Sequence, residues 1–476
     1  MSIEPIRRQS LISLGNLVGL TVIGYIATMY FAHVLGPAIL GSYYLFLSYY
    51  AIFSLIGDGG FGGAVTKPIS EGKEPDEYFS AFIVLRIILL TVTLTALFIL
   101  IPWLQDFSAS GLFPWLVIAL IAGTIAGIAY AGVYGLAQVG VVQISELLNT
   151  IVKIIVQIIV TILGYTAAGL AGGFIAGIIT GFIINFHYLS LKLVKFGKEH
   201  LKSLLSFSFW IFLTSSGFTI FATADTILIG YFLSNADVGI YRIAYQLTGV
   251  ALFVATALTT ALYPRMSRWH SEGDISSISS ALTRAFSFSL IIAIPVVIGG
   301  IILGDKLLYY LYGADFEAGT SALMILLLVQ IATIFVTIQI TCLNSIDQPK
   351  SSFIATVLSA SSNIVLNIIL IPLIGIAGAA LATLISVSMN AVLSYLFLSR
   401  KLHVSLEWIS LRNIIIAGGV MAIALFSFRL VTGIISVTYL VTAVAIGAII
   451  YFLILFNLDV KLRKEAGDLM RSVGLL

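Results

Sequence analysis

The chain has 476 residues, of which 60% are hydrophobic and only 9% are charged. Soluble domains carry roughly 25% charged residues, so this composition excludes a soluble protein and indicates a chain that the bilayer surrounds. The net charge of +3, without dense Lys/Arg clusters, excludes a nucleic-acid-binding protein, and a single cysteine, Cys342, excludes an intramolecular disulfide.

The apolar segments, taken in chain order, predict an all-α polytopic membrane protein with about 14 transmembrane helices. Each crossing needs about 20 predominantly apolar residues. Turn residues separate the segments, and one of these groups, Gly57-Asp58-Gly59-Gly60, is expected to begin an inner loop. The expected spans are 9–34, 38–57, 78–103, 112–136, 142–164, 168–191, 206–233, 238–263, 284–304, 317–344, 351–373, 376–399, 411–431 and 434–457.

The distribution of Lys and Arg predicts the orientation of the spans. Most of the 24 basic residues fall in every second connecting segment, and the other connections are short and nearly free of positive charge. Basic residues concentrate on the cytoplasmic side, so we expect a multi-pass protein of the cytoplasmic (inner) membrane with both termini in the cytoplasm. The expected inner segments contain the basic residues of 7–8, 67–73, 192–202, 265–284, 350, 400–412 and 461–471.

The two halves of the chain repeat each other. Leu35, Ala38, Gly41 and Tyr43 recur as Leu233, Ala236, Gly239 and Tyr241, and Gly169, Ala171, Gly172 and Ala176 recur as Gly375, Ala377, Gly378 and Ala382. Six spans per repeat predict two parallel six-helix lobes around a central cleft, with two C-terminal helices outside the repeat. The expected parts are an N-lobe at 1–191 (spans 1–6), a cytoplasmic linker at 192–205, a C-lobe at 206–400 (spans 7–12), and spans 13–14 with a cytoplasmic tail at 401–476.

Short motifs identify a family. They are Leu35-Gly36-Pro37, Ile69-Ser70-Glu71, Ala224-Asp225-Thr226, and Asn363-x-x-x-Asn367 running into Ile371-Pro372 and the segment from Gly375 to Thr383. By these motifs, which cover spans 1–12 in order, the chain resembles the polysaccharide-synthesis (O-antigen-type) flippases of the multidrug/oligosaccharidyl-lipid/polysaccharide exporter superfamily. The resemblance implies two six-helix lobes that move lipid-diphosphate-linked oligosaccharides from the inner to the outer leaflet.

Polar residues inside span 5 form the first candidate site. Glu146, Asn149, Lys153 and Gln157 are spaced by three or four residues and therefore share one helical face. Lys153 lies roughly 15 Å from the inner end of the span, and Arg86 in span 3 is also deep. Cations at that depth favour the passage of a diphosphate, so we expect these five residues to bind substrate. The alternative is a structural Glu146–Lys153 or Arg86–carboxylate pair.

A second set of polar residues occupies spans 7, 11 and 12. Asp225, Asn363, Asn367 and Thr383 all fall roughly 8–14 Å below the outer surface, and one carboxylate with neutral oxygens suits a hard cation. In the similar lipid II flippases, sodium binds at the matching positions, although there the residue at 367 is an acid. The backbone near Ala379 would add a carbonyl. The alternatives are a proton on Asp225 and an Asp–Asn hydrogen-bonded helix clamp.

The expected function is therefore a lipid-linked oligosaccharide flippase and not an enzyme. We expect no cofactor beyond a coupling ion, Na⁺ or H⁺. The expected partners are the lipid-linked oligosaccharide, membrane lipids, and glycosyltransferases or a polymerase of the same pathway. The alternatives are a cation-coupled multidrug exporter of the same superfamily and a membrane glycan polymerase or ligase. The short outer connections leave no room for the catalytic loop of such an enzyme.

Overall fold

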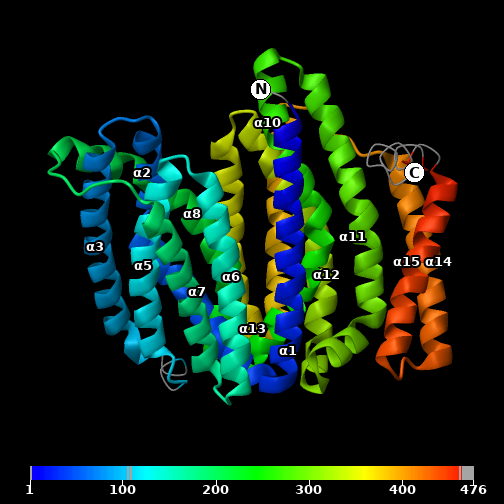
Figure 1. Ribbon diagram of the computed structural model, residues 1–476. Coiled ribbons are helices and arrows are strands. Elements are labelled where there is room, and N and C mark those ends of the chain that lie inside the picture. The colour runs from blue at the N-terminus through cyan, green and yellow to red at the C-terminus, as the bar shows by residue number, and fades with distance from the viewer. Residues whose placement is uncertain (1–2, 104–106, 108–109, 460–461, 464–476) are drawn as a thin grey trace. The chain divides into compact units, whose positions relative to one another are not determined.

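The computed structural model describes residues 3–103, 107, 110–459 and 462–463, and these residues contain helices and no strand (Figure 1). The α-helices are α1 (Ile3–Asp58), α2 (Phe61–Ser70), α3 (Pro75–Leu100), α5 (Phe113–Gly135), α6 (Val139–Ile162), α7 (Ala167–Tyr188), α8 (Lys198–Phe232), α9 (Asn235–Thr248), α10 (Phe253–Glu272), α11 (Ile275–Tyr312), α12 (Thr320–Ser345), α13 (Pro349–Ser399), α14 (Trp408–Thr432) and α15 (Val437–Leu458). Short 3₁₀ helices are η1 (Ile101–Trp103), η2 (Gly249–Leu252) and η3 (Ala314–Gly319).

The prediction of an all-α polytopic protein with about 14 membrane helices is confirmed. Eleven described helical segments are long and apolar enough to cross a membrane. Two of them contain two expected spans each, because α1 is broken at Gly36 (φ 72°) and α13 at Ile374 and Gly375 (φ 63°). The expected seventh span lies within α8, which runs from Lys198 to Phe232. Every expected span therefore corresponds to a described helix.

The chain divides into two compact units, Met1–Gly239 and Ile240–Leu476. In the first unit, α2, α3, α5 and α8 share a core that includes Phe61, Phe82 and Leu204. In the second unit, one core joins α10, α11 and α12, and another joins α11, α14 and α15. The predicted division into two parallel lobes around a cleft stays a prediction.

The expected linker at 192–205 contacts the first unit. Its first residues are extended, and the Lys192 N–H donates to the Asp76 carboxylate (2.8 Å) while the Val194 N–H donates to the Ser80 hydroxyl (2.9 Å). Buried His200 accepts the Gly197 N–H at Nδ1 (3.1 Å) and approaches the Glu74 carboxylate with Nε2 (2.9 Å). These contacts hold the segment against the start of α3.

Two C-terminal helices, α14 and α15, pack side by side and against α11 (Figure 1). Arg429 of α14 makes a bidentate pair with Asp305 of α11 (2.9 and 2.8 Å). The Tyr451 hydroxyl of α15 donates to the Ile291 carbonyl (2.9 Å). Since buried polar groups require partners, these contacts fix the two helices to the second unit as well as their apolar faces do.

Candidate substrate and ion sites

Arg86 lies in an ion pair within the first unit. Its guanidinium Nη1 donates to the Asp58 carboxylate (2.7 Å) and to the Gly57 carbonyl (2.8 Å). The Arg86 side chain is 5% exposed and that of Asp58 36% exposed. The geometry is therefore that of the alternative, an Arg86–carboxylate pair, and not that of a cation facing an open path.

The residues that Arg86 contacts lie where the second expected span, 38–57, ends and the short helix α2 follows after a break. The expected inner loop at Gly57–Gly60 is wrong, because the chain turns there and continues as α2 to Ser70. Arg86 lies about 16 Å along α3 from Pro75, so the break has the same depth. Its polar backbone is tolerated because Arg86 bonds the free carbonyl at the end of α1, where the helix dipole also favours a cation.

Close packing against α8 completes the break. A Cβ on Gly60, which has φ of 77°, would come within 2.3 Å of the Ser208 carbonyl oxygen and 2.7 Å of the Phe212 backbone nitrogen. Only glycine meets both demands, so the glycines of this segment serve a membrane-embedded helix break.

Span 5 corresponds to α6, and two of the four polar residues on its common face pack against α7. Gln157 is 3% exposed and its amide donates to the Tyr43 hydroxyl and to the Leu170 carbonyl, each at 2.8 Å. Asn149 faces two glycines of α7, and a Cβ on Gly177 would lie 2.5 Å from its Oδ1. Because small residues let helices approach closely in a membrane, Asn149 and Gln157 hold α6 against α7.

Lys153 differs from its neighbours on this face. It lies one turn from both Asn149 and Gln157, it is half-buried, and among the described residues it forms no hydrogen bond or ion pair. Glu146 is exposed and shares a hydrogen bond with Tyr130 of α5, so the alternative Glu146–Lys153 pair is not formed. Asn149 and Gln157 therefore serve helix packing, whereas Lys153 is a cation with no partner carboxylate among the described residues.

The second unit brings together three residues of the candidate ion site. The Asn363 amide donates to the Thr383 hydroxyl (3.2 Å), and the Asn367 amide donates to Asn363 Oδ1 (3.0 Å). All three side chains are buried, as is Ala379 one turn before Thr383. Asp225 is buried in α8, in the first unit.

The geometry of the Asn363 amide tests the fit of a cation. Its nitrogen, which cannot ligate a cation, points to Thr383, and its oxygen already accepts from Asn367. Both bonds lie within α13 and neither involves Asp225, so the Asp–Asn helix clamp stays a prediction. A sodium site would need this amide to turn over so that neutral oxygens converge, and the ion stays a prediction.

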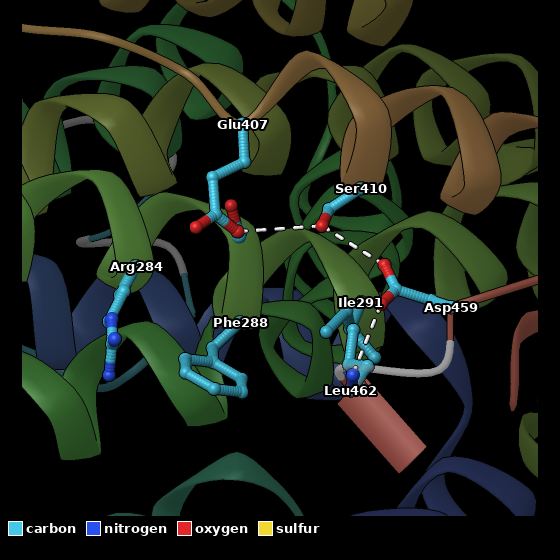
Figure 2. A pocket seen from close by; sticks show the side chains of 8 residues that line it. Arg284, Phe288, Ile291, Glu407, Ser410, Asp459 and Leu462 are labelled. Carbon is cyan, nitrogen blue, oxygen red and sulfur yellow. Dashed lines mark hydrogen bonds between the residues drawn. The ribbon is translucent and has the colours of Figure 1, made fainter. Parts of the chain in front are cut away.

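A small pocket in the second unit lies beside the end of α15. Figure 2 shows the Ser410 hydroxyl between two carboxylates; it donates to Asp459 (3.0 Å) and lies 3.4 Å from Glu407. Asp459 also accepts the Leu462 N–H (3.1 Å). The cavity of about 20 Å³ has room for about one water molecule, so it serves helix docking and holds no glycan.

Asp58 and Tyr43 are partners of the candidate residues that the sequence did not reveal. The glycines at 57, 59 and 60 predict a loop around Asp58. A usable indication was present, since an acid between two apolar stretches needs a partner and Arg86 is the buried base in the adjacent span. Tyr43 carried no such indication, because a buried tyrosine hydroxyl takes a partner but the sequence does not show which residue it is.

Family models match most of the described helices. The model of a family described as polysaccharide biosynthesis protein matches residues 8–270. A second model, described as MatE, matches residues 211–369. The first match covers more than half of the chain.

Individual relatives agree with these models. The chain is 26% identical over 427 residues to the probable low-salt glycan biosynthesis flippase Agl15 of Haloferax volcanii, covering 90% of each chain. It is 26% identical over 475 residues to the probable flippase AglR of the same organism, covering 98% of this chain and 99% of that one. In fold it is similar to the lipid II flippase MurJ in an inward closed conformation, with a TM-score of 0.77, 18% identity, and coverage of 94% and 98%.

Proposed function

The chain belongs to the polysaccharide biosynthesis protein family, and from this premise we propose that it is a flippase for a lipid-linked oligosaccharide. It is a multi-pass membrane protein and a transporter rather than an enzyme. The transported molecule would carry an anionic phosphate link, and it would move from the inner to the outer leaflet for glycan assembly. Two relatives that match nearly the whole chain are named as probable flippases, one of them for glycan biosynthesis, and these names support the proposal.

The observation that carries the proposal is that Lys153 has no ion-pair partner among the described residues. A cation without a partner carboxylate is expensive inside a bilayer, and such residues mark the paths of substrates or ions. Lys153 stands near the middle of α6, whereas Arg86 is already neutralised by Asp58. We therefore propose that Lys153 is the cation that faces the phosphate link during passage, while Arg86 has a structural role.

A flipping assay with reconstituted protein tests the proposal. Proteoliposomes would carry a fluorescent lipid-linked oligosaccharide, and a membrane-impermeant quencher would report how much reaches the opposite leaflet. We expect transport by the wild type and its loss in Lys153→Ala, with partial retention in Lys153→Arg. Wild-type protein that folds but leaves the lipid in its original leaflet would refute the proposal.

A second candidate is a cation-coupled multidrug exporter. The match of the MatE model to residues 211–369 favours it. An exporter would stimulate efflux of organic cations in the same vesicles and would ignore lipid-linked glycans, so the two substrates decide between the candidates. Lys153 would also hinder the binding of an organic cation in a membrane cavity, because like charges repel strongly at low dielectric.

Coupling and orientation belong to the same proposal. With no nucleotide-binding motif, transport would draw on a Na⁺ or H⁺ gradient or on consumption of the product, and Asp225, Asn363, Asn367 and Thr383 remain the proposed ion-linked residues. Both termini would lie in the cytoplasm, because the basic residues favour that side. Glycosyltransferases or a polymerase that make or use the lipid-linked glycan would be the functional partners.

A further inference from the structure

A cleft in the first unit has no role in the site described above. It has a volume of about 480 Å³ and opens between the end of α2, the 71–74 loop and the first turns of α8. Lys67 and Lys73 line it from one side, and Phe207 and Trp210 line it from α8. A cleft of this size accommodates a ligand group well beyond a single ion or water.

The two lysines of the cleft are available to an anion. Lys67 is exposed, forms no ion pair with a described residue, and places its ammonium 5.6 Å from the centre of the Phe207 ring. Lys73 pairs with Glu71 at 2.7 Å, but both side chains are exposed, at 72% and 37%. Such a surface pair contributes little free energy, so Lys73 can exchange a carboxylate for a phosphate at small cost.

The opposite wall of the cleft is apolar and faces outward. Phe207 is 45% exposed and Trp210 is 65% exposed, and Leu205 and Phe209 beside them are also exposed. Tryptophan rings such as that of Trp210 gather where lipid headgroups meet hydrocarbon. The cleft thus presents ammonium groups and apolar rings within one volume, which matches an amphiphile with an anionic head and a long apolar chain.

We propose that this cleft binds the phosphate-bearing headgroup of the lipid-linked substrate before it enters the transport path. Lys67 and Lys73 hold phosphate oxygens, and Phe207 and Trp210 pack against the first part of the lipid chain. The inference rests on the proposed function, because it assigns the cleft to the same substrate. It differs from the Lys153 proposal in location, since the cleft lies at the end of α2 where the basic 67–73 segment is expected to meet the cytoplasm.

A short helix connects the cleft with the membrane-embedded break. Lys67 lies near the end of α2, and the same helix begins at Phe61, directly after Gly60 and close in sequence to the Arg86–Asp58 pair. A headgroup held by Lys67 therefore contacts α2, the short helix that the break separates from α1. This placement makes the cleft a loading site rather than part of the central path.

Binding to the purified full chain tests the proposal. The protein is placed in nanodiscs of zwitterionic lipid, and native mass spectrometry measures the affinity for a polyprenyl diphosphate. Each lysine is expected to contribute about fivefold, so Lys67→Ala weakens binding about fivefold and Lys67→Ala with Lys73→Ala about 25-fold. Lys67→Arg retains binding, and Lys350→Ala, an exposed basic residue outside the cleft, serves as the matched control.

Comparison of ligands separates the sources of phosphate. Phosphatidylglycerol carries one phosphate on two acyl chains, and inorganic pyrophosphate carries the head without the chain. Binding of polyprenyl diphosphate at least tenfold tighter than either supports the proposal, as does its loss in Trp210→Ser. Equal binding of phosphatidylglycerol indicates a general anionic-lipid surface, equal binding of pyrophosphate indicates a simple anion site, and either result overturns the proposal.

The flipping assay distinguishes this inference from the proposed function. If wild-type protein flips the lipid-linked glycan while both lysine variants bind and flip it normally, the cleft proposal fails and the function stands. If the wild type binds polyprenyl diphosphate in a manner that requires Lys67 but flips no glycan, the cleft proposal stands and the function fails. Thermal unfolding of each variant shows that a loss of binding is not a loss of folding.

Discussion

The Arg86 guanidinium and the Asp58 carboxylate meet across 2.7 Å at a break in a membrane helix. The same Arg86 nitrogen also donates to the Gly57 carbonyl, so one side chain neutralises an acid and satisfies the free backbone at the end of α1. Discontinuous helices in transporters place such polar backbone where it is buried in protein or lines a cavity. In this chain a base from the neighbouring helix lies at that point.

Removal of Arg86 is expected to destabilise the first unit. Arg86→Ala leaves the Asp58 carboxylate and the Gly57 carbonyl without their Arg86 donor. The free energy of unfolding should fall by roughly 2–4 kcal/mol, which is less than for a fully buried pair because Asp58 is partly exposed. Thermal unfolding in detergent would measure the loss. Arg86→Ala with Asp58→Asn should recover part of it, and a double variant as unstable as the sum of both singles would contradict the pairing.

Lys153 and Gln157 are expected to fail in different ways. Lys153→Ala should abolish glycan transport without loss of stability, because a half-buried cation without a partner carboxylate contributes nothing favourable to folding in a bilayer. Gln157→Ala should instead lower stability by about 1–3 kcal/mol, since it removes the buried amide that bonds the Tyr43 hydroxyl and the Leu170 carbonyl. Paired transport and unfolding measurements decide; normal transport by Lys153→Ala would exclude a role for its charge.

Packing of α6 on α7 should tolerate no side chain at Gly177. In Gly177→Ala the new Cβ would lie 2.5 Å from Asn149 Oδ1 and 2.7 Å from its backbone oxygen, so the helices must separate. Overpacking of this kind costs roughly 1–3 kcal/mol. Gly140→Ala in the same helix pair meets nothing within 4 Å and is the matched control. Equal melting temperatures for the two variants would show that α7 does not approach α6 this closely.

A sodium titration tests the ion proposal. If Asn363, Asn367 and Thr383 ligate sodium after the Asn363 amide turns over, sodium should raise the melting temperature of the wild type but not of Asn363→Ala or Asp225→Asn. Potassium at the same concentration controls for ionic strength. A proton on Asp225 predicts that transport is lost in Asp225→Asn and nearly unaffected in Asn363→Ala. Stability indifferent to sodium up to high concentration would leave the three residues as a helix clamp.

Acid should weaken the start of α11 through Asp274. The Ser277 side chain, the Ser277 N–H and the Ser276 hydroxyl keep the pKa of Asp274 below its ordinary value of 3.8. A lowered folded-state pKa means that the stabilisation is fully present above the unfolded value, near 3.9, and is lost as pH falls through the folded pKa. The difference in melting temperature between wild type and Asp274→Ala should therefore be constant near neutral pH and shrink below about pH 3.8. A difference that persists unchanged at pH 3 would argue against this cap.

The sequence by itself determined the membrane class, the positions of the expected membrane spans and the family. Long apolar runs have one stable form in a bilayer, because only a helix satisfies its own backbone there, so composition and period were sufficient. The motif from Asn363 to Thr383 was also correctly assigned to two helices, since Gly375 permits a turn that other residues resist. Candidate residues could be located along each span for the same reason.

Only the tertiary structure decided which of these residues are free to act. Arg86 and Lys153 look alike in the sequence, as single bases at similar depth in apolar spans. The fold places Asp58 against Arg86 and glycines of α7 beside Lys153, so one base is neutralised and the other has no carboxylate partner among the described residues. Charge pairing depends on which helices become neighbours, and helix neighbours are set by packing between segments far apart in the chain.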